Sequence, residues 1–271
     1  MDAAGHAVER PTRGCASAWA VVLEQELREL WWGGRGVPLS FAFSLLLSVI
    51  AYLVATNTAL NFLEQREAAN LTLQVGIAVG ALLALLAAAD AVSGERERRT
   101  LESLLLAPVS RRQLATGKLL AALSLWLAAF AITVPYVWFL GRGVGIVGDA
   151  LVTGLLVGTL LAVFLASLGL AVSLFASSNR ISLSLSLFAL LALFAPTQLP
   201  ASAQRGWAGE LLLRVNPLTA GEHYVGKIVV NGHAWSADVS WLASPLATAI
   251  VFAAAVPLLA TRFLRLRGIS A

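Results

Sequence analysis

Long apolar runs alternate with short polar segments along this chain, and the pattern predicts its main elements. An α-helix needs about 20 apolar residues to cross the hydrocarbon core of a bilayer. Six stretches reach that length, and they lie near residues 37–57, 71–92, 114–140, 150–177, 181–199 and 240–262. In the fifth, serine and leucine alternate as in a strand, but an open strand in lipid leaves backbone groups unpaired, so a helix is favoured. The sequence therefore predicts an all-α, polytopic integral membrane protein with six transmembrane helices.

Three segments outside these spans have patterns of their own. Residues 17–32 place apolar side chains at helical spacing, with charged residues on the remaining surface. We expect an amphipathic helix in the membrane interface with its apolar side in lipid; a helix that merely anchors the N-terminus is the alternative. Residues 93–113 form a charged loop between two spans. Residues 200–239 are partly apolar, around Trp207 and Leu211–Leu213, and are expected to form short helices that dip toward the membrane.

The charged loop contains a short apolar segment with the signals of a helix. Thr100 is suited to cap a helix through Leu101–Leu106, which Pro108 ends about two turns later. Arginines flank this segment at positions 96, 98, 99, 111 and 112. Membrane topology and binding to anionic lipid head groups explain the arginines alone. They do not explain the apolar helix, which predicts a docking surface for a soluble partner.

Composition and charge place the chain in a membrane and give it an orientation. Of its 271 residues, 58% are hydrophobic and 13% are charged, and the mean hydropathy is +0.80, whereas a soluble domain has about 25% charged residues. Basic residues collect on the cytoplasmic side of membrane proteins. Here 14 of the 19 lie on the side with both termini and the charged loop, which we therefore expect to be cytoplasmic. The single cysteine, Cys15, excludes an internal disulfide.

The charged loop resembles that of ABC-2-type transporter permeases. Loops of that family typically read Glu-X-Glu-X-Gly-Thr-Leu-Glu-X-Leu-Leu-X-X-Pro-Val-Ser-Arg, and Gly-Lys then opens the third span. Residues 95–112 read Glu-Arg-Glu-Arg-Arg-Thr-Leu-Glu-Ser-Leu-Leu-Leu-Ala-Pro-Val-Ser-Arg-Arg and are followed by Gly117-Lys118. The chain departs from the pattern at Arg99, where the family usually has glycine. Asn216-Pro217-Leu218-Thr219 is similar to an element that family members have before the last span, so the resemblance covers nearly the whole chain.

The resemblance implies that residues 100–107 form a coupling helix, which seats in a cleft of a separate ATPase subunit. The docking residues that it implies are Glu95, Arg98, Thr100, Leu101, Glu102, Leu104, Leu105, Pro108 and Arg111. The chain has no Gly-X-X-X-X-Gly-Lys-Ser/Thr motif, so we expect ATP and Mg²⁺ on the ATPase and no cofactor here. The other expected partners are membrane lipid and a second permease copy in a homodimer, with no nucleic acid. The implied location is the cytoplasmic (inner) membrane of a prokaryote.

The transport pathway leaves fewer signals. Ser182 and Ser186 share one helical face, and with Asn216 and Pro217 they are the candidate pathway or gate residues. The serines either line a polar cavity or bond to neighbouring helices, and we favour the second interpretation. Asp90 comes closest to being an ionisable residue within a span, but we expect it at the helix end. The near absence of such residues argues against a proton- or sodium-coupled carrier.

Two further patterns have common alternative explanations. The pairs Gly76-X-X-X-Gly80 and Gly154-X-X-X-Gly158 permit close helix contact, although glycine and alanine are frequent enough for the spacing to arise by chance. His223 and His233 are a weak metal signal, because no cysteine accompanies them and surface histidines are more common than ligands.

Three functional classes follow. The first is the permease subunit of an ABC exporter with an unidentified substrate, which we favour. The second is a subunit of an ABC machine that matures an extracytoplasmic metalloenzyme, of the nitrous-oxide-reductase copper-site type, with a periplasmic partner protein. The third, a membrane enzyme, is disfavoured because neither His-Glu-X-X-His nor Gly-X-Ser-X-Gly occurs.

Overall fold

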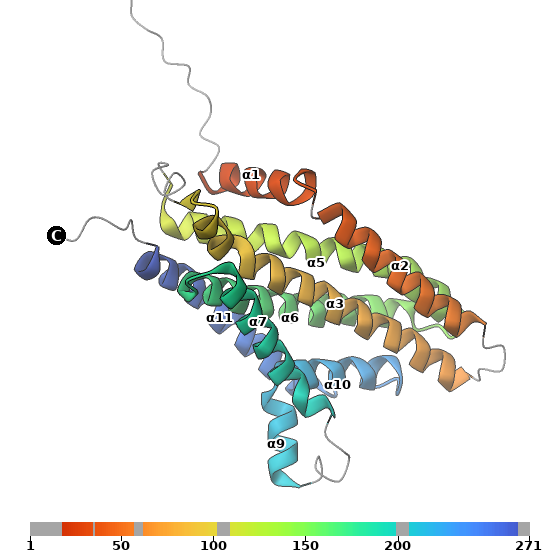
Figure 1. Cartoon of the computed structure of the whole chain (residues 1–271). Coiled ribbons are helices and arrows are strands. Elements are labelled where there is room, and N and C mark those ends of the chain that lie inside the picture. Colours follow the sequence, from red (N-terminus) through yellow and green to blue (C-terminus); the bar gives the residue numbers. More distant parts are fainter. Residues whose placement is uncertain (1–17, 35, 57–61, 102–108, 199–205, 265–271) are drawn as a thin grey trace, which may run out of the picture.

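The computed structural model describes residues 18–34, 36–56, 62–101, 109–198 and 206–264. Every regular element within these ranges is helical, and six helices are long and apolar enough to cross a membrane (Figure 1). They are α2 (Gly36–Ala55), α3 (Phe62–Glu97), α5 (Arg111–Gly141), α6 (Val147–Phe175), α7 (Asn179–Phe194) and α11 (Ala243–Phe263), and the span of α7 reaches the needed length by continuing to Thr197. The predicted all-α fold class with six spans is confirmed.

The shorter elements gather at the two ends of this bundle (Figure 1). They are α1 (Ala18–Trp32), α9 (Trp207–Val215), α10 (Pro217–Val229) and the 3-10 turns η1 (Ala195–Gln198) and η2 (Val239–Leu242). We call the end where α3 finishes and α5 begins the loop end. The opposite end, where α3 begins and α10 packs, is the far end, and Arg66 of α3 donates a hydrogen bond to Val230 O there at 3.1 Å.

α3 is longer than the apolar run that predicted it. The expected span covered residues 71–92, but the helix runs from Phe62 to Glu97. At about 1.5 Å per residue it extends about 54 Å, beyond the roughly 30 Å of hydrocarbon. Hydropathy detects only the apolar part of a helix. Backbone hydrogen bonding continues through the polar turns at both ends, because their side chains bind to other parts of the protein. We had expected Asp90 at the end of this helix, and that prediction is wrong. It lies inside α3, which continues to Glu97.

Close contacts between α3, α5 and α6 form the core, and glycines make them possible. A Cβ on Gly158 would lie 2.1 Å from Cη2 of Trp126, and one on Gly154 would lie 2.6 Å from Cδ1 of Leu73. A Cβ on Gly80 would meet the same indole at 2.8 Å. Real side-chain atoms do not approach so closely, so both glycine pairs serve helix packing. Trp126 is 1% exposed, and it fills the space that the glycines leave.

α1 packs against α5, and its placement relative to lipid stays a prediction. Val22 is buried over Gly117, where a Cβ would lie 2.8 Å from Val22 Cγ1. At the other end of α1, Trp31 Nε1 donates a hydrogen bond to Ser124 Oγ at 3.0 Å. Val22 and Trp31 thus fix this helix on α5, because α5 presents a small residue and a hydrogen-bonding hydroxyl to them. Three leucines of the same helix remain partly exposed, namely Leu23, Leu27 and Leu30.

Candidate functional site

The ends of α3 and α5 fix both borders of the segment that the sequence predicts to dock a partner. After α3, Arg99 turns the chain with a φ of 60°. A side chain in this left-handed region costs about 1–2 kcal/mol, which explains the advantage of glycine at this position. Before α5, Ser110 Oγ accepts a hydrogen bond from Gln113 N at 3.3 Å, and Gln113 Oε1 accepts one from Ser110 N at 3.1 Å. This capping box gives the helix a defined start.

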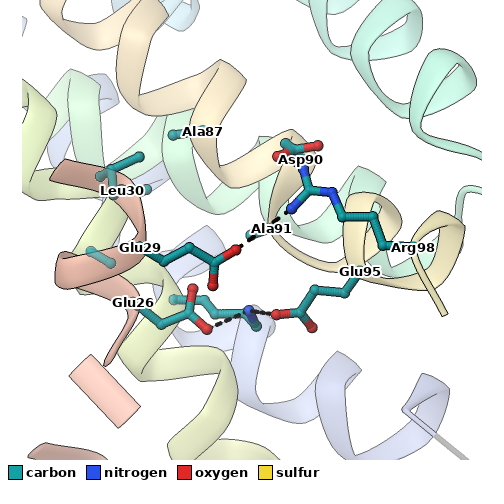
Figure 2. Close-up of a pocket in the computed structure, with 11 residues that line it drawn as sticks. Glu26, Glu29, Leu30, Ala87, Asp90, Ala91, Glu95 and Arg98 are labelled. Atoms are coloured by element: carbon teal, nitrogen blue, oxygen red, sulfur yellow. Dashed lines mark hydrogen bonds and ion pairs between the residues drawn. The ribbon is translucent and has the colours of Figure 1, made fainter. Parts of the chain in front are cut away.

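A buried lysine connects three helices next to this segment, and its two glutamate partners, Glu26 and Glu95, are labelled in Figure 2. Lys118 of α5 has a side chain that is only 1% exposed, and its Nζ lies 2.6 Å from Glu26 Oε1 of α1 and 2.5 Å from Glu95 Oε1 of α3. A buried charge is tolerated only when it is paired and hydrogen-bonded. The Lys118 triad, as we call Lys118, Glu26 and Glu95, therefore holds α1 and the end of α3 against the start of α5.

A second set of charges connects the same region to α7. Arg98 lies 3.3 Å from Asp90 Oδ2 and 3.6 Å from Glu29 Oε1 of α1. The other Asp90 oxygen accepts a hydrogen bond from Asn179 Nδ2 at 2.6 Å, at the start of α7. Asn179 N in turn donates to Glu97 Oε2 at 3.1 Å. One small cavity of about 60 Å³ lies between the two sets, and its lining includes four carboxylates, Arg98 and Lys118 (Figure 2).

Two arginines bind the C-terminal ends of other helices at the loop end. Arg96 donates hydrogen bonds to the carbonyls of Ala176 and Leu174, where α6 ends. Arg111 donates to Thr261 O at 3.4 Å, in the last turn of α11. Cations at these positions satisfy free carbonyls and complement the helix dipole. The borders of the predicted docking segment are thus in contact with α1, α3, α5, α6, α7 and α11.

The predicted docking residues divide into three groups. Glu95 and Arg98 point into the charged cavity, and Leu101 packs partly buried against the core. Thr100 and Arg111 are exposed. The remaining predicted residues, which lie outside the described part of the chain, are Glu102, Leu104, Leu105 and Pro108. Docking through these residues stays a prediction.

The four candidate pathway residues lie where α7 meets its neighbours. Ser182 is buried and donates a hydrogen bond to Ala89 O of α3 at 2.7 Å, as the favoured interpretation expected, while Ser186 Oγ is buried without a partner among the described residues. Asn216 caps α10 by accepting from Leu218 N at 2.9 Å, and its amide donates to Leu193 O at 2.6 Å. Pro217 is the first residue of α10. Their role in a pathway stays a prediction.

The sequence interpretation missed Lys118 as a structural residue. It was counted among the basic residues that set topology, although it lies four residues inside an expected apolar span, and a charge there signals a partner. Glu26 and Asn179 gave no signal of their own, because they are ordinary polar residues in a surface helix and at a helix start.

Comparison with known proteins supplies the family. The family model described as ABC-2 family transporter protein matches residues 22–259, from α1 into α11. No curated protein matches the chain.

Proposed function

Because the chain belongs to the ABC-2 transporter family, we propose that it is the permease subunit of an ABC exporter, driven by a separate ATPase subunit that docks on residues 95–111, the docking segment. The observation that carries this proposal is the Lys118 triad. It connects both borders of the docking segment, Glu95 near the end of α3 and Lys118 near the start of α5, and adds α1.

A movement of the ATPase can reach the membrane helices only if the docking segment is held rigidly by them. A docking segment on loose helix ends would absorb a movement of the ATPase, whereas buried ion pairs resist separation because each ion would be left uncompensated. Arg98, Asp90 and Asn179 extend the connection to α7. A displacement of the docking segment is therefore passed to the helix that has the candidate pathway residues Ser182 and Ser186.

The rest of the assembly follows from the family and from charge. ATP and Mg²⁺ belong to the ATPase subunit, and this chain contributes no ATPase site. Two identical permeases around a two-fold axis form the transport path most simply, and the exposed apolar faces of α2, α7 and α11 contact lipid or that second copy. With the basic residues of the loop end inside, both termini are cytoplasmic in a prokaryotic inner membrane. The maturation role, with its periplasmic partner, is the alternative, and the genes beside this one separate the two.

The docking proposal is tested by placing a charge on the docking segment. The tagged chain is isolated in detergent from the membranes of its own host, and the ATPase that accompanies it is identified by mass spectrometry. Leu105→Asp should abolish this co-purification, since a charge buried in an interface without a partner is costly. Leu211→Asp, a matched change of an exposed leucine on α9 at the far end, should retain it. Wild-type amounts of ATPase with Leu105→Asp would contradict the docking site.

A further inference from the structure

Glu222 of α10 lies between two hollows at the far end of the bundle. One is an open cavity of about 430 Å³, whose other lining residues include Thr219, His223, Lys227, Asn231 and Trp241. The other is a narrow apolar groove between α3, α6, α7 and α10, with Ile77, Val157, Leu161 and Phe194 in its walls. Glu222 lines both. The open cavity has the size of typical small-molecule sites, about 300–1,000 Å³.

The lysine that lines the open cavity already has a carboxylate partner. Lys227 Nζ lies 2.9 Å from Asp238 Oδ1, and His233 Nδ1 lies 2.8 Å from the other oxygen of that carboxylate. These hydrogen bonds lower the pKa of Asp238, so it stays ionised and keeps its partners. Burial, and next the charge of Lys227, lowers the pKa of His223. Since an ordinary histidine titrates near pH 6.5, roughly, the His223 imidazole is neutral at pH 7.

Glu222 is the uncompensated charge of this cavity. Among the described residues, its carboxylate has no hydrogen bond or ion pair, and the pKa of Glu222 is raised by burial alone. A half-buried carboxylate without a partner loses hydration and gains nothing in return. A ligand with a positive charge beside this carboxylate compensates for the lost hydration energy. The cavity therefore favours cationic ligands.

An aromatic surface completes the site. Trp241 stacks with His223 at 4.1 Å between ring centroids, and Arg214 and Lys227 lie 5.1 and 5.5 Å from its ring centre. Because these two cations already lie near the ring, the indole contributes apolar contact to a ligand's body, and the positive group of the ligand is left to Glu222. Beyond Glu222 the apolar groove offers contacts to a hydrocarbon or aromatic body.

We propose that this cavity binds organic cations with an apolar body, with the positive group against Glu222 and the body along Trp241 and the mouth of the groove. In naming such cations as the substrate class the proposal rests on the proposed export function, but binding itself does not require it. A free amphipathic cation and the ammonium head group of a membrane lipid share this chemistry.

The test uses two ions of the same shape and opposite charge, tetraphenylphosphonium and tetraphenylborate. Calorimetric titration of the full chain in a neutral detergent should show tetraphenylphosphonium binding that weakens about tenfold in Glu222→Gln, as expected for the loss of one partly screened charge contact. Glu24→Gln changes an exposed carboxylate of α1 at the loop end, paired with Arg28 at 2.7 Å, and should leave the affinity within about twofold. Tetraphenylborate should bind no tighter to the wild type than to Glu222→Gln.

Equal tetraphenylphosphonium binding by wild type and Glu222→Gln, or equal binding of the two ions, would overturn the proposal. Mass spectrometry of co-purified phosphatidylethanolamine separates the sources. If less of this lipid co-purifies with Glu222→Gln than with the wild type, the site exists and its occupant is the ammonium group of a lipid. If the amounts are equal but tetraphenylphosphonium binds more weakly to Glu222→Gln, the site exists and its occupant is a free cation. The assay contains no ATPase, so its failure leaves the docking proposal intact, and loss of ATPase docking leaves this result unchanged.

Discussion

Replacing Lys118 by methionine tests whether a buried charge stabilises the loop end. Methionine keeps most of the apolar stem but leaves Glu26 and Glu95 facing each other without their shared cation. Removing one partner of a buried ion pair costs about 3–5 kcal/mol. The side chains of Glu26 and Glu95 are 17% and 15% exposed, so water reaches them slightly and we expect the lower end of that range.

The assay is thermal denaturation of the detergent-solubilised chain. A loss of about 3 kcal/mol lowers Tm by about 6–12 °C for a protein of this size. Hydrogen exchange should also accelerate in α1, because Glu26 connects that helix to the bundle. Arg28→Met is the matched control on α1. It removes an ion pair with Glu24 in which the side chains are 73% and 64% exposed, and it should change stability by less than about 1 kcal/mol.

A triple variant, Lys118→Met with Glu26→Gln and Glu95→Gln, separates charge from packing. The triple variant leaves no uncompensated charge, and an amide that lacks a partner costs less than a carboxylate that lacks one, so this variant should regain most of the lost Tm. If Lys118→Met melts like the Arg28→Met control, the reasoning about the triad is refuted. If the triple variant melts as low as Lys118→Met, the loss comes from packing and not from uncompensated carboxylates.

Three further changes have expected outcomes. Arg99→Gly should raise stability by about 1 kcal/mol in thermal denaturation by relieving the left-handed backbone, and Arg99→Ala, which keeps that strain, should give no such gain. Gly158→Ala should lower stability by about 1–3 kcal/mol, because its Cβ would overlap Trp126, whereas Gly148→Ala, which points into open space, should not; equal Tm values for the two would contradict the packing argument. Tetraphenylphosphonium affinity should fall as pH decreases through the raised pKa of Glu222, because protonation removes the negative charge, and protonation of His223 acts in the same direction. In Glu222→Gln only the His223 part should persist in a calorimetric pH series, and a wild-type affinity independent of pH would argue against an ionised Glu222.

Apolar content was sufficient to predict the six spans, because a bilayer demands a nearly uniform apolar length and no other element satisfies it. The same signal placed the ends of α3 wrongly, since it ignores polar turns that find protein partners. Spacing also placed Ser182 and Ser186 on one face correctly, and its period follows from helix geometry alone.

Pairing between distant positions was beyond the sequence. Lys118 is separated from Glu26 by 92 residues and from Glu95 by 23, and many other carboxylates have similar local patterns. Only packing selects these two. Glu222 was missed for a related reason. It lies on α10, a short helix outside the expected spans, and only the folded structure shows that its carboxylate lies beside a groove between four helices.

The dipeptide Gly117-Lys118, a family feature in the sequence, forms two halves of one contact. Gly117 has no side chain, so α1 comes close enough for Val22 to lie over it, and Lys118 then reaches Glu26 of the same helix. A side chain at position 117 would displace Val22, and an uncharged one at 118 would leave Glu26 facing Glu95. Because Glu95 lies in the last turn of α3, any movement of that end either moves α1 with it or separates buried ions. Separation is the costlier course, so we expect α1 to move with α3 and α5 and to support the proposed docking segment.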